Sequence, residues 1–163
     1  MPLSSDPADF EDPLENYEAP PYGDALEQAL AEHKVSAIQS VPFATTTPEA
    51  SVAEAVEILA NLHGGCLLVE KDGKLAGVIT DRDVVDKVAL EYDDMKARPV
   101  STVMTYDPVF VYQTDTLSAA LSVMAVSGYR YVPVVDREQR IRGIVSPQRV
   151  TGYLRRVFDA GIK

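Results

Sequence analysis

The feature that most restricts what this chain can fold into is an internal repeat. Apolar residues with helical spacing occur twice, and the second set lies 65 residues after the first. Each set predicts the buried stripe of an amphipathic helix. Self-similarity at one long period predicts two copies of a supersecondary unit, each too small to bury its apolar face alone. The two stripes are Val52, Ala55, Val56 and Leu59, and then Leu117, Ala120, Leu121 and Met124.

The segments that flank these helices repeat as well. Each copy is predicted to contain a short strand, the amphipathic helix, a glycine, two strands joined by a polar turn, and a closing helix. This order predicts an α/β (α+β) fold in which two pseudo-symmetric copies pack face to face and leave clefts between them. The predicted strands are 43–46, 66–69 and 75–79 in the first copy, and 109–112, 131–135 and 141–145 in the second.

The net charge of −10 belongs to the N-terminal part of the chain. Residues 1–33 contain nine acids and no Lys or Arg, which leaves 16 acids against 15 bases in the rest. Residues 1–23 also carry five prolines, so we expect a disordered acidic tail that serves as a solubility tail or as a docking segment. Within this tail, Tyr17 and Tyr22 are the only residues that favour the docking segment over the solubility tail. The nearly neutral body has no basic stripe, so neither nucleic acid nor a membrane surface is an expected partner.

Between the tail and the first copy, Asp24 can cap a helix that begins at Ala25. Apolar residues with helical spacing continue from Leu26 to Val41, and Pro42 predicts the end of this helix. The expected organisation is a tail (1–23), an N-terminal helix and linker (24–41), a first repeat (42–97) and a second repeat (98–163).

Several classes of protein are not expected. No apolar run is long enough to span a membrane, and no signal peptide precedes the tail, so a cytoplasmic location is expected. The single cysteine, Cys66, lies in an apolar run and is predicted to be a buried hydrophobe and not a reactive thiol. His33 and His63 have no cysteine or carboxylate cluster beside them, so no metal site is predicted. Without a phosphate-binding glycine loop or a His–acid pair beside a nucleophile, we do not expect an enzyme.

The repeat order, taken with the segments "GVITDRDVV", "VMTYDPVFV" and "RYVPVVD", resembles a tandem pair of CBS domains, also called a Bateman module. The resemblance covers residues 35–157. It implies two repeats in a flat disc, with two clefts between them that commonly hold AMP, ADP, ATP or another adenosyl compound. It also implies that two discs associate into a homodimer.

The resemblance places a ligand at the end of the first repeat. The family signature of Gly, hydrophobic, any, Thr or Ser, any, any, Asp is intact from Gly77 to Asp83. Asp83 is implied to accept hydrogen bonds from the ribose hydroxyls beside Thr80, at a helix start where the dipole favours its charge. The spacing of Thr80 and Asp83 is also that of a capping box, a purely structural device. One carboxylate oxygen can cap the helix while the other faces the cleft, so both interpretations stay open.

The other parts of the ligand are implied more weakly. Arg130 matches the position at which such pairs place a cation toward the phosphate, and Arg82 is a second candidate at the rim of the cleft. Either residue is alternatively a solvated surface arginine. The resemblance implies that Val78 and Val109 line the adenine, whose edge would be read by backbone groups.

The second repeat departs from the signature. Arg149 stands where the ribose-reading acid is expected, and a guanidinium has no acceptor for hydroxyl groups. Ser146 followed by Pro147 looks like a helix N-cap with proline in the first turn, which is a structural arrangement. We therefore expect one good site and one degraded site, which is either empty or offers Arg149 to a phosphate.

The function expected from these patterns is a regulatory module that binds an adenine nucleotide and signals to an unknown effector protein in trans. No cofactor is expected to be obligatory, and Mg²⁺ would accompany only the phosphates of the ligand. The alternative is a structural or dimerisation module that binds no small molecule.

Overall fold

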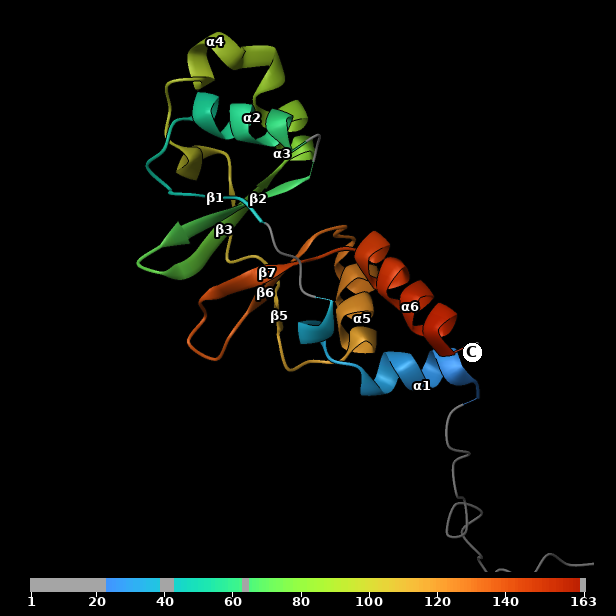
Figure 1. The fold of residues 1–163 in the computed structure, drawn as a ribbon. Helices are drawn as coiled ribbons and strands as arrows, with labels where there is room; N and C mark the ends of the chain where they lie inside the picture. The colour runs from blue at the N-terminus through green and yellow to red at the C-terminus, as the bar shows by residue number, and fades with distance from the viewer. Residues whose placement is uncertain (1–22, 39–42, 63–64, 162–163) are drawn as a thin grey trace, which may run out of the picture.

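The computed structural model describes residues 23–38, 43–62 and 65–161 (Figure 1). The predicted disordered tail, apart from Gly23, lies outside the described residues, as do Val41, Pro42 and His63. Within the described residues the chain forms two halves, each built from one sheet with helices against it.

Two separate sheets confirm the α/β fold with an internal repeat. The first has the order β1-β2-β3-β4, and the second has the order β5-β6-β7. In each sheet the first strand runs parallel to the second, which forms an antiparallel hairpin with the third. The strands are β1 (Thr45–Thr46), β2 (Cys66–Lys71), β3 (Lys74–Thr80), β4 (Thr105–Tyr106), β5 (Val111–Tyr112), β6 (Val132–Val135) and β7 (Ile141–Val145).

The two predicted amphipathic helices form where the stripes lie. Helix α2 (Val52–Asn61) begins with a capping box formed by Ser51 and Glu54, and α5 (Leu117–Ser127) is capped by Thr116. Each helix buries the predicted stripe against its sheet. Helices α3 (Asp81–Lys87) and α6 (Pro147–Gly161) close the two halves, and a short α4 (Tyr92–Met95) follows α3.

The prediction of one helix from Ala25 to residue 41 is wrong. Helix α1 (Ala25–Glu32) is capped by Asp24 as expected, but the backbone of His33 is extended. Lys34 then forms a β-bridge with Thr116, and a single 3₁₀ turn (Val35–Ala37) follows. Tertiary hydrogen bonds to the second half replace those that would have continued the helix, which overrides the helical spacing of the side chains.

The segment after α1 completes the second half of the molecule. The Val35 amide donates to the carbonyl of Asp115 at 2.8 Å, and the Leu117 amide donates to the carbonyl of His33 at 3.0 Å. Val35 and Ile38 are buried in the core formed by α5, β5, β6 and α6. The order of segments along the chain therefore differs from their grouping in space.

The first half receives a matching segment from the chain that leads into the second repeat. The Val100 amide donates to the carbonyl of Ala50 at 2.8 Å, Pro99 forms a β-bridge with Ser51, and β4 pairs with β3. Val100, Val103 and Met104 are buried in the core of the first half. The β-bridge and the amide hydrogen bond of one segment match those of the other at a spacing of 65 residues, so the pseudo-symmetry extends to these backbone contacts.

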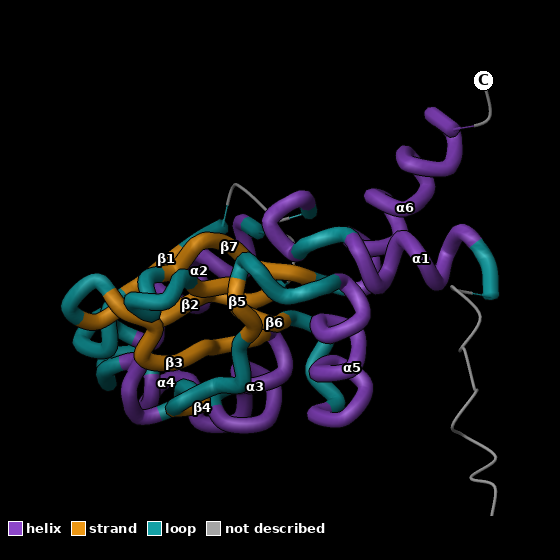
Figure 2. The backbone as a smooth tube through the Cα atoms, turned by 90° about the horizontal axis from the view of Figure 1, so that it is seen from below, coloured by secondary structure: helices purple, strands orange, loops and turns teal. Residues whose placement is uncertain are grey.

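A third apolar cluster joins the two sheets. Cys66, Leu68 and Ile144 are its buried members, and they come from both halves. The strands of both sheets lie close together when the molecule is seen from below (Figure 2). The prediction that Cys66 is buried is confirmed, and burial raises the pKa of its thiol to about 12, with Asp83 and Asp81 adding to the shift.

Gly77 allows β4 to lie close against β3. A Cβ atom at this position would lie 2.8 Å from the Thr105 carbonyl oxygen and 2.8 Å from the Met104 sulfur. We expect Gly77→Ala to lower the free energy of unfolding by about 1–3 kcal/mol, because the backbone must shift to admit the methyl group.

Gly152→Ala is the matched control for Gly77→Ala. Gly152 lies in α6 and has open space where its Cβ would be, so alanine is expected to leave stability unchanged or raise it by about 1 kcal/mol. Urea unfolding of both variants measures the difference. Equal midpoints for the two variants would contradict the close approach of β4.

Candidate functional site

One cavity of about 420 Å³ lies between the two halves. Its lining comes from the end of β3, the start of α3 and β4 on one side, and from β6 and the loops before β5 and β6 on the other. All six residues predicted for the good site line it: Val78, Thr80, Arg82, Asp83, Val109 and Arg130. The structure therefore brings together residues that lie as far as 52 positions apart in the sequence.

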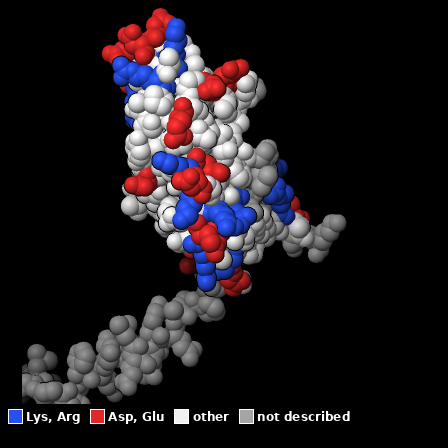
Figure 3. All heavy atoms as spheres, turned by 90° about the vertical axis from the view of Figure 1, so that its left-hand side faces the viewer, with Lys and Arg blue, Asp and Glu red and all other residues white. Residues whose placement is uncertain are grey.

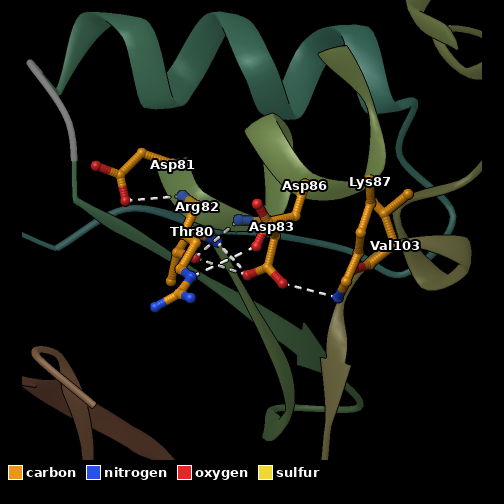
Figure 4. A network of polar contacts seen from close by, with 7 residues as sticks. All are labelled: Thr80, Asp81, Arg82, Asp83, Asp86, Lys87 and Val103. Atoms are coloured by element: carbon orange, nitrogen blue, oxygen red, sulfur yellow. Dashed lines mark hydrogen bonds and ion pairs between the residues drawn. The ribbon is translucent and has the colours of Figure 1, made fainter. Parts of the chain in front are cut away.

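Asp83 is held by the start of its own helix (Figure 4). Its Oδ2 accepts hydrogen bonds from the Thr80 amide at 2.9 Å and from the Thr80 hydroxyl at 2.7 Å. The Asp83 amide donates back to Thr80 Oγ1 at 3.2 Å, which completes a capping box. The structural role considered for these two residues is thus present.

Asp83 also faces a lysine. Lys87 Nζ donates to Asp83 Oδ1 at 2.7 Å and to the carbonyl of Val103 at 2.8 Å. The Asp83 side chain is 14% exposed. A carboxylate offers about four lone-pair sites, and these contacts use three of them. One acceptor position of Asp83 is therefore left for a ligand. Asp83 lines the cavity, and the cavity is large enough for a ligand.

The two candidate cations differ in their surroundings. Arg82 Nε lies 3.4 Å from Asp86 Oδ2, and both side chains are largely exposed, so this ion pair contributes little to stability. Arg130 is exposed just after Gly128, which ends α5 in the left-handed conformation. Among the described residues, Arg130 forms no hydrogen bond or ion pair, so its guanidinium is available to an anion.

Other residues of the cavity were not predicted from the sequence. Two acids of α3, Asp81 in its first turn and Asp86 near its end, belong to the lining. So do two tyrosines, Tyr129 and Tyr131, on either side of Arg130. The sequence run Tyr-Arg-Tyr could have indicated these two tyrosines, because aromatic rings beside a cation are typical of sites for flat, charged ligands. The remaining unpredicted residues are Thr105, Pro108, Ser127, Gly128 and Pro133.

The corresponding end of the second repeat carries different side chains. Ser146 is buried, and its carbonyl accepts hydrogen bonds from the amides of Arg149 and Val150 at 3.0 and 3.1 Å. Arg149 lies in the first turn of α6, so the position of Asp83 in α3 is taken by a guanidinium. The degraded second site stays a prediction, because residues 63–64 on the loop after α2 lie outside the described residues.

Neither a metal centre nor a membrane span is seen in the described part of the chain. No group of three or more His, Cys, Asp or Glu there could hold a metal ion. No helix there has the length and apolarity needed to cross a membrane. His33 is half-buried and packs edge to face against Tyr153. On the face shown in Figure 3, basic and acidic side chains lie among one another.

These features define a class of protein: a tandem α/β repeat with a ligand-sized cavity between its halves. The chain belongs to the CBS domain family, whose model matches residues 35–90 and 100–156. It is 35% identical over 102 residues to the CBS domain-containing protein CBSCBSPB5 of Arabidopsis thaliana, covering 63% of this chain and 18% of that protein. It is 31% identical over 103 residues to YhcV of Bacillus subtilis, covering 63% of this chain and 72% of that protein.

Solved structures of CBS domain pairs share the fold. One is CBSX2 in complex with AMP, with a TM-score of 0.67 and 23% identity over 77% of this chain and 98% of that one. Another is the CBS domain pair of MJ0100 in complex with 5′-methylthioadenosine and S-adenosyl-L-methionine. Its TM-score is 0.65, with 25% identity over 79% of this chain and 98% of that one.

Proposed function

We propose that this protein is a regulatory module that binds an adenosyl compound in the cavity between its two repeats. The observation that carries the proposal is the convergence of Thr80 and Asp83 from the first half with Val109 and Arg130 from the second on one cavity. The complex of the MJ0100 domain pair with two adenosyl compounds supports this ligand class.

Each part of an adenosyl ligand has a matching group in the lining. The remaining acceptor position of Asp83 suits a ribose hydroxyl, and a carboxylate accepts such bonds strongly. Val78 and Val109 offer apolar contact to adenine. Arg130 offers a planar pair of donors to a phosphate. The predicted second site, at Ser146 and Arg149, lacks the acid, so we propose one ligand per chain.

Regulation follows from the position of the cavity. A ligand that contacts both halves stabilises the arrangement of the halves in which it can reach both of them. It shifts the equilibrium between this arrangement and others by the difference in its affinity for them. We propose that a partner protein reads this change. Association into a homodimer is a further part of the proposal, supported by the large apolar side chains that a single chain leaves exposed, Val85, Leu90 and Val126.

Thermal unfolding with and without ligand tests the proposal. At a ligand concentration of 100 times the Kd, binding to the folded state adds about 2.7 kcal/mol to the free energy of unfolding. We therefore expect at least one of adenosine, methylthioadenosine, AMP, ADP and ATP to raise the melting temperature, while cytidine and CMP at equal concentration do not. No shift with any adenosyl compound would reject the proposal.

One observation favours a second function, that of a structural module without a ligand. The capping box and Lys87 account for the position of Asp83 without any bound molecule. A module of this kind would show the same melting temperature with every compound of the panel. The same measurement therefore separates the two functions.

A further inference from the structure

We infer that the cavity selects an adenine nucleotide with a single phosphate over a triphosphate, and that Asp86 sets this preference. The inference deepens the proposed function and rests on it. Its basis is the arrangement of charged side chains around the cavity, since neither the shape of the cavity nor the capping box distinguishes the lengths of phosphate chains.

Charges in the lining do not favour a polyphosphate. The lining contains three carboxylates and two guanidiniums: those of Asp81, Asp83 and Asp86, and those of Arg82 and Arg130. Lys87 neutralises Asp83 at 2.7 Å, which leaves a lining close to neutral. ATP carries about two more negative charges than AMP at neutral pH, and each added phosphate is repelled by the carboxylates that remain.

The two guanidiniums are not equally available. Asp86 accepts a hydrogen bond from Arg82 Nε at 3.4 Å, so the charge of Arg82 is already partly balanced by a carboxylate of its own helix (Figure 4). Arg130, on the opposite wall, has no such partner among the described residues. One free guanidinium matches one phosphate group held by two parallel hydrogen bonds. A second or third phosphate would add negative charge to a lining that also holds Asp81 and Asp86, and Arg82 is already paired with Asp86.

Asp86 is the better test residue because it does not cap the helix. Its side chain is 60% exposed, and within the described residues its side-chain partner is Arg82. Asp86→Asn removes one negative charge from the lining and releases Arg82, while the capping box of Thr80 and Asp83 stays intact. Asp94→Asn is the matched control, because Asp94 is exposed on α4 and lies outside the cavity lining.

The experiment is a calorimetric titration of the full chain with adenosine, methylthioadenosine, AMP, ADP and ATP, in buffer free of divalent cations and at one ionic strength. For the unchanged protein we expect AMP to bind at least tenfold more tightly than ATP and than the two compounds without phosphate. In Asp86→Asn the ratio of AMP to ATP affinity is expected to fall by about fivefold, whereas Asp94→Asn leaves it unchanged. Arg130→Gln is expected to remove most of the preference for AMP over adenosine.

Three results would overturn the inference while leaving the proposed function in place. They are ATP binding as tightly as AMP, adenosine or methylthioadenosine binding as tightly as AMP, and an equal change of the AMP-to-ATP ratio in Asp86→Asn and Asp94→Asn. If no compound of the panel binds, the proposed function itself fails, so the two failures are distinguishable.

Discussion

Replacing Asp83 with alanine is expected to weaken the binding of an adenosyl ligand by about ten- to a hundredfold. This range corresponds to the loss of hydrogen bonds to a charged acceptor. The carboxylate is the acidic group that both faces the cavity and is fixed at its wall, by Thr80 on one oxygen and Lys87 on the other. Calorimetric titration with the tightest compound of the adenosyl panel measures the effect.

The capping role of Asp83 makes a matched control necessary. Glu54 forms the same capping box with Ser51 at the start of α2, and neither residue lines the cavity. Glu54→Ala should therefore cost about 1 kcal/mol of stability through the lost cap, as Asp83→Ala also does, but should leave ligand affinity unchanged. If both variants lose the same stability and bind the ligand equally well, Asp83 is a cap only.

Replacing Ile38 with alanine is expected to lower the free energy of unfolding by about 3 kcal/mol, because a large side chain is removed from a packed core. Ile38 precedes the first repeat, yet it is buried among residues of α5, β5, β6 and α6 in the second half. For a chain of this size the melting temperature should fall by on the order of 10 °C, as measured by thermal unfolding followed by circular dichroism.

Ser36→Ala on the same turn serves as the control for Ile38→Ala. The Ser36 side chain is exposed and lines neither core, so its replacement should change stability by less than about 0.5 kcal/mol. Were residues 34–38 a simple linker, the two variants would unfold at the same temperature. The pair thus tests whether the segment before the first repeat is part of the core of the second half.

Local patterns predicted the repeat and the site signature well. The helical stripes that begin at Val52 and Leu117 form α2 and α5, and the glycine-containing hairpins form β2–β3 and β6–β7. The spacing of Thr80 and Asp83 indicated both a cap and a ribose contact. The structure shows the cap and places the pair at a cavity, while the ribose contact stays a prediction.

Longer-range features were not predictable in the same way. Helix α1 stops at Glu32 although the apolar spacing continues, because Lys34 and Val35 pair with the backbone that enters α5. Strand β4 has only two residues, which carry no alternating pattern of their own, and it forms because Gly77 admits it beside β3. The presence of Asp81 and Asp86 in the cavity lining was also not predictable, since only the fold shows which side chains of α3 line the cavity.

By itself, the sequence determined the two copies of the unit, the order of strands and helices in each, and the presence of the acid signature in one copy and of Arg149 in the other. These features depend on residues within one or two helical turns of each other, whose spacing acts directly on local structure. Only the tertiary structure decided which segment completes which half and which side chains share the cavity. Those outcomes depend on backbone hydrogen bonds and packing between residues far apart in the chain, which no local spacing records.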